Sequence, residues 1–217
     1  IGILYFVNLE RFTAPPHEKW SKSLQIATMD SYYNPQVAID SDNIHLYYSE
    51  DHQLIHKQFD QDYRITKEET IDTTGTWDDF YVYQNEAILY KDGILIDVSS
   101  NTEIDEADTF HRGVGEIVYY TKGQDVYTYN AATKKTEKLF TVSHEVEKIS
   151  ATDQLLLVYS KNLNKGVYSI YEKKDANQYE LILTENIDVG ISNMINQIEF
   201  TSNDNQVFFA VTAETQS

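Results

Sequence analysis

One pattern recurs along most of the chain: a short apolar run, a tight polar turn and a second short apolar run. It is clearest between Gly115 and Val142, where runs at residues 117–120, 126–129 and 139–142 alternate with polar turns. β-Branched and aromatic residues fill the runs, which predicts an antiparallel meander of strands. The first run is apolar at successive positions, as in a strand with both faces covered, so we expect sheets packed against sheets.

Similar units begin near Ile44, Ala87, Leu155 and Val207, before and after the unit at Ile117. The spacing between successive units is comparable with the length of a four-stranded propeller blade, which is about 40–50 residues. A shorter run precedes the core run in four units, at residues 36–39, 80–83, 146–149 and 197–200. In the unit at Ile117 the corresponding strand is expected around residues 109–114, where the pattern is weak.

Over roughly residues 35–217 this succession resembles a β-propeller, in the loose sense shared by WD40-like, quinoprotein-like and TolB-like propellers. The resemblance implies an all-β, propeller-like array of antiparallel meanders with about five blades. The dipeptide Trp77-Asp78 precedes a strand and does not recur, so it is not the WD40 signature. Residues 24–29 fit a strand or, after Pro16, part of a helix; as a strand they would complete the last blade and close the ring. Because propellers host enzymes, scaffolds and receptors alike, the fold fixes no activity.

The N-terminal segment is expected to lie outside the propeller-like domain. Residues 1–16 form an apolar segment and linker, and the propeller-like domain covers residues 17–217. Residues 1–7 are apolar but too few to span a bilayer, which takes about 20 residues. They fit either the outer end of a membrane anchor, with aromatic side chains and Arg11 near the interface, or a buried strand. With an anchor, the acidic domain would lie outside the cytoplasm.

The composition excludes some partners. The 17 basic residues are outnumbered by 35 acidic ones, which gives a net charge of −18. Phosphate backbones and anionic lipid surfaces repel such a chain, so no nucleic-acid partner is expected. The chain has no cysteine, which excludes disulfides and thiolate chemistry. Secreted and surface proteins of Gram-positive bacteria commonly lack cysteine, but so do many cytosolic chains.

Three stretches have the polarity of long connections between units: residues 68–76, 99–109 and 186–196. The first two are expected to join an outer strand to the next inner strand, on the face that usually carries the ligand in propellers. The third is weakly apolar and fits one helical turn.

One group of residues is the candidate ligand site. It combines an aromatic plate, carboxylates and a guanidinium, which suit a sugar, a peptide or another small ligand. Its members are Trp77, Asp78, Asp79, Tyr81, His111 and Arg112. The alternative is that Trp77 packs between blades while the charged groups are solvated.

No catalytic, cofactor or metal site is predicted. His52 and His56 are four residues apart, as in helical metal sites, but in a strand they would lie about 13 Å apart. Residues 40–43 and 202–205 look like fragments of calcium loops, yet they lack the glycine and closing glutamate of an EF-hand and fall where hairpin turns are expected. Carboxylates are abundant, but the sequence shows no pair at the separation that glycosidases need.

These features favour an extracytoplasmic, non-enzymatic binding or sensing domain, anchored to the cell-surface membrane of a bacterium of the Gram-positive type. Its partner would be a protein or a glycan at the cell envelope. The alternatives are a carbohydrate-active or peptide-hydrolysing enzyme that uses an acidic central face, and a structural module of a larger envelope assembly.

Overall fold

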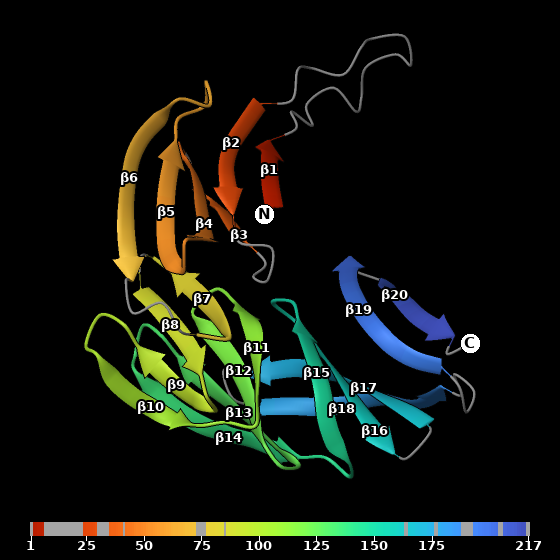
Figure 1. The fold of residues 1–217 in the computed structure, drawn as a ribbon. Helices are drawn as coiled ribbons and strands as arrows, with labels where there is room; N and C mark the ends of the chain where they lie inside the picture. The colour runs from red at the N-terminus through yellow and green to blue at the C-terminus, as the bar shows by residue number, and fades with distance from the viewer. Residues whose placement is uncertain are drawn as a thin grey trace, which may run out of the picture. The chain divides into compact units, whose positions relative to one another are not determined.

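The computed structural model describes ten stretches of the chain: residues 2–6, 24–29, 35–40, 42–72, 77–84, 86–162, 165–175, 178–187, 193–203 and 206–215. Every regular element in these stretches is a β-strand, and every strand pair is antiparallel (Figure 1). The chain forms two compact units, Ile1–Asp78 and Asp79–Ser217. Within the described stretches, no helix is long and apolar enough to cross a membrane.

The first unit contains a two-stranded and a four-stranded sheet. Its strands are β1 (Gly2–Phe6), β2 (Leu24–Met29), β3 (Gln36–Ile39), β4 (Ile44–Glu50), β5 (Gln53–Phe59) and β6 (Ile65–Asp72). β1 pairs with β2, and β3 to β6 follow one another across the second sheet in sequence order. The tight β4–β5 turn is formed by Asp51 and His52, whose φ angles of 50° and 59° match the right-handed twist of a hairpin.

The second unit contains three four-stranded sheets and a final pair. The strands of the first two sheets are β7 (Asp79–Tyr83), β8 (Glu86–Lys91), β9 (Ile94–Asp97), β10 (Thr102–Glu106), β11 (Thr109–Val114), β12 (Ile117–Lys122), β13 (Asp125–Asn130) and β14 (Lys135–Thr141). The remaining strands are β15 (Glu145–Ala151), β16 (Leu155–Asn162), β17 (Lys165–Asp175), β18 (Gln178–Ile187), β19 (Asn193–Asn203) and β20 (Gln206–Thr215). Each four-stranded sheet is a meander in sequence order, as the unit at Ile117 predicted.

The sheets of the second unit stack face to face, with their first strands next to one another. β11 contacts β7 on one side and β15 on the other, and β15 also contacts β19. Apolar clusters fill the space between sheets: Ile88 and Leu95 pack with Val118 and Tyr120. On the opposite face of β12, Tyr119 packs with residues of the following sheet. The successive apolar positions of β12 are therefore buried on both faces, and the arrangement is propeller-like.

Polar contacts also join the β7–β10 sheet to the β11–β14 sheet. Each strand of the first sheet supplies one carboxylate, and the second sheet supplies the cation or hydroxyl. The contacts are Asp79 with Arg112, Glu86 with Lys134, Asp97 with Tyr129 and Lys134, and Asp105 with Tyr120 and Lys122. In these contacts the acceptor is on the β7–β10 sheet, whereas the Tyr81 hydroxyl of β7 donates in the reverse direction to the Gly115 carbonyl.

The connections expected at residues 68–76 and 99–109 were partly wrong. β6 and β10 are regular outer strands, and β10 itself lies inside the stretch expected to link two units. Their side chains are mostly charged or hydroxylic because an outer strand has little core to cover. The weak strand expected around residues 109–114 is present as β11.

Other expectations fall partly outside the described residues. Residues 24–29 form strand β2, which confirms that alternative, but residues 17–23 are not described. The proposed boundary at residue 16 and the turn at residues 204–205 also lie outside them. Gly2–Phe6 is a strand paired with β2. Four four-stranded sheets and two strand pairs are consistent with about five blades, while closure of the ring stays a prediction.

Candidate functional site

Four of the six predicted ligand-site residues lie on neighbouring strands of the second unit. Asp79 and Tyr81 are on β7, and His111 and Arg112 are on β11. The Arg112 Nη2 atom lies 2.9 Å from Asp79 Oδ1, and its guanidinium stands 5.0 Å from the centre of the Phe80 ring. This half-buried ion pair and cation–π contact join two adjacent sheets.

His111 is a buried, neutral histidine. Its Nδ1 accepts a hydrogen bond from the Ile149 backbone N–H at 3.2 Å, so its proton is on Nε2, which lies 2.8 Å from the Thr109 hydroxyl. Burial, followed by the nearby Lys148, lowers the pKa of His111 to about 3. The imidazole connects β11 to β15 of the next sheet.

The other predicted residues have different surroundings. The Tyr81 hydroxyl donates to the Gly115 carbonyl at 2.8 Å, and burial raises the Tyr81 pKa to about 12. Trp77 is buried and Asp78 is exposed, and both belong to the first unit. The structure thus brings Asp79, Arg112 and His111 into joints between sheets, while the ligand-binding role of the six residues stays a prediction.

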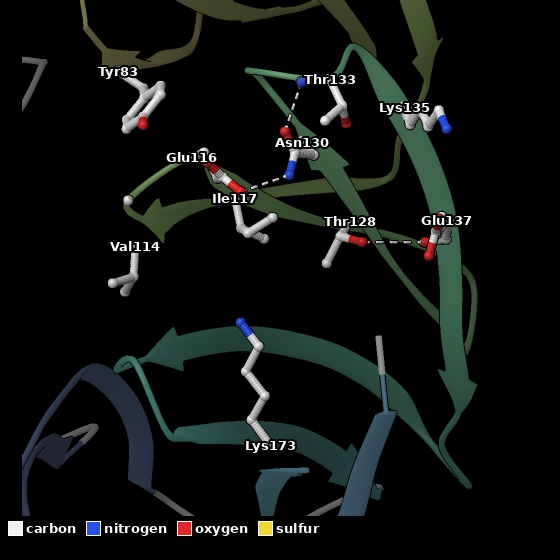
Figure 2. Close-up of a pocket in the computed structure, with 11 residues that line it drawn as sticks. Tyr83, Val114, Glu116, Ile117, Thr128, Asn130, Thr133, Lys135, Glu137 and Lys173 are labelled. Atoms are coloured by element: carbon white, nitrogen blue, oxygen red, sulfur yellow. Dashed lines mark hydrogen bonds between the residues drawn. The ribbon is translucent and has the colours of Figure 1, made fainter. Parts of the chain in front are cut away.

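A pocket of about 470 Å³ opens in the second unit next to Tyr83 and Val114, the last residues of β7 and β11 (Figure 2). Its walls come from the β11–β12 turn, one face of the β12–β14 strands, and single side chains of β7 and β17. The lining residues are Tyr83, Val114, Gly115, Glu116, Ile117, Thr128, Asn130, Thr133, Lys135, Glu137 and Lys173. This volume is within the range of small-molecule sites.

Strand register explains how the floor of the pocket forms. Asn130 pairs with Lys135 and Thr128 pairs with Glu137, so these side chains share one face of the sheet. Ile117 is opposite Asn130 on the next strand. The Asn130 amide donates to Glu116 Oε1 at 3.0 Å and its oxygen accepts from the Thr133 N–H at 2.8 Å, which fixes the rim (Figure 2).

The pocket carries charges of both signs. Glu116 and Glu137 lie on the β11–β14 sheet together with Lys135. Lys173 comes from β17 of the following sheet, and its ammonium points toward Glu116 and Ile117 across the open space (Figure 2). Two carboxylates, two ammonium groups and several hydroxyl and amide groups suit a ligand that has both donors and acceptors. The sequence did not indicate this pocket because its members are spread over three sheets and match no motif.

Six carboxyl groups of the described residues have a lowered pKa: Asp40, Glu69, Glu86, Asp97, Asp105 and Asp125. For Asp97, burial opposes ionisation, but the bonds from Lys134 and Ser99 outweigh it and bring the pKa to about 2. A general acid of a glycosidase needs the opposite shift. These six groups are therefore suited to structural ion pairs and hydrogen bonds rather than to proton donation.

No protein-family model matches the sequence, and no curated protein matches it. Among solved structures, Hsv2 of Kluyveromyces lactis superposes with a TM-score of 0.58 at 8% identity, over 89% of this chain and 61% of Hsv2. KlAtg21, solved in complex with the coiled coil of AgAtg16, gives a TM-score of 0.54 at 11% identity, over 88% of this chain and 69% of that one. The chain is a propeller-like repeat domain. It spans less than two thirds of the length of Hsv2, and identities this low show the fold alone.

Proposed function

We propose that this chain is a non-enzymatic binding or sensing domain and that the pocket at the β11–β14 sheet is its ligand site. The observation that carries the proposal is the mixed lining of this pocket. It combines the aromatic ring of Tyr83 from β7, aliphatic side chains at the β11–β12 turn, and charged groups of both signs. Pockets with a few convergent polar groups are the usual form of a recognition site.

The ligand that fits this lining best is a short peptide segment. Its backbone amides and carbonyls match the hydroxyl and amide groups of Thr128, Asn130 and Thr133, and charged side chains match the lysines and glutamates. Propeller-type structures similar to this chain include one solved with a protein partner, KlAtg21 with the coiled coil of AgAtg16. That supports a protein partner over other classes.

The proposal also places the domain outside the cytoplasm, tethered to a cell-surface membrane. It is supported by the absence of cysteine and by the net charge of −18. Protease treatment of intact source cells tests this location. Loss of the domain from intact cells is expected, and protection until the cells are lysed would contradict it.

The ligand site is tested with defined probes. An array of heptapeptides and a panel of soluble oligosaccharides are screened against the purified chain, and hits are titrated by calorimetry. Lys173→Ala should weaken peptide binding at least tenfold, since a charge-assisted contact contributes about 1.5–3 kcal/mol. Lys161→Ala removes the same charge from an exposed position of the same sheet and should leave the affinity unchanged.

Two results would contradict the proposal. If peptides bind equally to the wild type and to Lys173→Ala, the pocket is not the site. If oligosaccharides bind and peptides do not, the ligand is a glycan.

A further inference from the structure

Four side chains form a continuous hydrogen-bonded chain across one face of the β3–β6 sheet in the first unit. Asp40 Oδ2 lies 3.0 Å from His45 Nε2, and His45 Nδ1 lies 3.0 Å from His56 Nε2. His56 Nδ1 lies 2.9 Å from Glu69 Oε1. Asp40 follows β3, and the other three residues lie on β4, β5 and β6, so the chain links all four strands.

Both ends of this chain are ionised carboxylates. The hydrogen bond from His45, followed by the backbone N–H groups of Asp42 and Asn43, holds the pKa of Asp40 far below its usual range. Hydrogen bonds from Lys67 and then from His56 lower the pKa of Glu69. Ionised carboxylates only accept hydrogen bonds, so both terminal contacts need an imidazole N–H.

Counting protons gives the charge of the histidine pair. The two terminal contacts use one N–H each, and the central contact between the rings needs one more. Three protons are therefore shared among the four ring nitrogens. Two neutral imidazoles carry only two protons, so the pair that makes all three bonds has one positive charge.

The burial of the two rings shows where this charge resides. The His45 side chain is 16% exposed and contacts Asp40, whereas the His56 side chain is 1% exposed. Burial lowers the pKa of His56 below its ordinary value, and the stacked Tyr47 ring, at 4.5 Å, covers one side of it. His45 is thus the imidazolium, donating to Asp40 and to His56, and neutral His56 donates from Nδ1 to Glu69.

Several groups among the described residues surround the pair. Lys67 of β6 lies 2.6 Å from Glu69 and neutralises part of its charge. Tyr47 of β4 is next to both rings on the same face. Gln58 is opposite His45 in the β4–β5 register, and Met29 of β2 packs with Leu46 and Tyr48 on the other face.

We propose that His45 and His56 form a proton-binding site that holds one shared proton near neutral pH and acts as an acid-sensitive switch of the β3–β6 sheet. This goes beyond the proposed ligand site, which belongs to the other unit. A second proton would place two N–H groups opposite each other in the central contact and two positive charges on stacked rings. Loss of the shared proton would leave one of the three contacts without a donor. The three-bond chain therefore exists only with one charge on the pair.

The variant Glu69→Gln tests the proton count directly. Glutamine can donate its amide N–H to His56 Nδ1, so His56 would carry its proton on Nε2 and donate to His45. All three contacts are then satisfied with two neutral rings. The variant should therefore release the shared proton, although no histidine has been changed. Glu68→Gln is the matched control, because this substitution removes the same charge from the adjacent residue. Glu68 pairs with Lys57 and is not part of the chain of hydrogen bonds.

The measurement is ¹⁵N NMR of the imidazole nitrogens in the full chain at pH 7. The expected wild-type pattern is an imidazolium for His45 and an Nδ1–H tautomer for His56. Glu69→Gln should give two neutral rings with His56 in the Nε2–H form, and Glu68→Gln should keep the wild-type pattern. Two neutral rings in the wild type, or the same ring states in Glu69→Gln as in the wild type, would overturn the proposal.

The switch itself is tested by amide hydrogen exchange. After correction for the intrinsic pH dependence, protection of β4 and β5 should fall at least tenfold between pH 7 and pH 5. Equal protection of β4 and β5 at both pH values would show that the pair is not a switch.

Discussion

His111 should make the chain sensitive to acid, and the size of the effect follows from its surroundings. The imidazole is buried between β11 and β15 and stays neutral, with a pKa of about 3, while an unfolded histidine has a pKa of about 6.5. Below pH 6.5 the unfolded state binds a proton that the folded state does not. The contribution of His111 to stability is therefore complete above pH 6.5 and is lost as the pH falls toward 3.

At pH 5.0 the expected loss is about 2 kcal/mol, since the unfolded pKa lies 1.5 units higher and each unit corresponds to about 1.4 kcal/mol. This figure hardly depends on the folded pKa, because a value of about 3 is already well below pH 5. At the acid limit the loss would approach about 5 kcal/mol, which is a large part of the stability of an ordinary domain.

The assay compares the wild type with His111→Gln, a side chain that does not titrate. Free energies of unfolding are measured in urea at pH 7.5 and pH 5.0, and the difference between the two proteins is taken at each pH. This difference should shrink by about 2 kcal/mol at pH 5.0, whatever the variant costs at pH 7.5. His144→Gln serves as the control for loss of an imidazole from the turn before β15. If the difference in the free energy of unfolding between the wild type and His111→Gln is the same at both pH values, the reasoning is refuted.

Three further predictions concern stability, each measured by urea denaturation at pH 7.5. Asp97→Asn should cost about 2 kcal/mol because it removes the buried acceptor of Lys134 and Tyr129, whereas Asp153→Asn in an exposed turn should cost less than about 0.5 kcal/mol. Gly113→Ala should cost more than about 3 kcal/mol, since a Cβ would lie 1.3 Å from the Ile117 carbonyl oxygen; Gly123→Ala meets no atom within 4 Å and should cost about 1 kcal/mol for its φ of 59°. Leu156→Ala should cost about 3 kcal/mol at a fully buried position, and Ile182→Lys, at a position 52% exposed, should stay within about 0.5 kcal/mol. Equal costs within any of the three pairs would contradict the packing described here.

The sequence predicted the inner parts of the sheets because those strands must cover two cores. In the second and third strands of the unit at Ile117, β12 has four successive apolar or aromatic residues and β13 has three among its six. The outer strands β6 and β10 were missed because backbone hydrogen bonds hold them in the sheet without an apolar pattern. The strand pattern of β11 was weak in the sequence because His111 and Arg112 are polar. In the structure both side chains have partners on neighbouring sheets.

The candidate sites show which features could not be predicted from the sequence. Of the selected residues, Asp79 and Arg112 pair across one joint between sheets, and His111 lies in the next joint. A sequence does not distinguish a ligand site from such a joint. His56 was weighed against His52, four residues away, and not against His45. The hairpin turn at Asp51 and His52 fixes the register that makes His45 and His56 diagonal neighbours. The sequence therefore contains the information that pairs His45 with His56, but the hairpin turn has to be located before the register can be counted.

The ion pairs between the β7–β10 and β11–β14 sheets, with every carboxylate on the first sheet, have a consequence for how such a chain can grow. Each strand of the first sheet contributes a carboxylate, and the second sheet contributes the cations and hydroxyls that bind these carboxylates. A duplicated β7–β10 sheet stacked in place of the β11–β14 sheet would lack Arg112, Lys122 and Lys134, and would leave these carboxylates without their counter-charges. Gene duplication of this single sheet is therefore disfavoured, whereas duplication of the two sheets together preserves every ion pair. The ion pairs thus make the two sheets, rather than one, the unit that can be copied without loss of counter-charges.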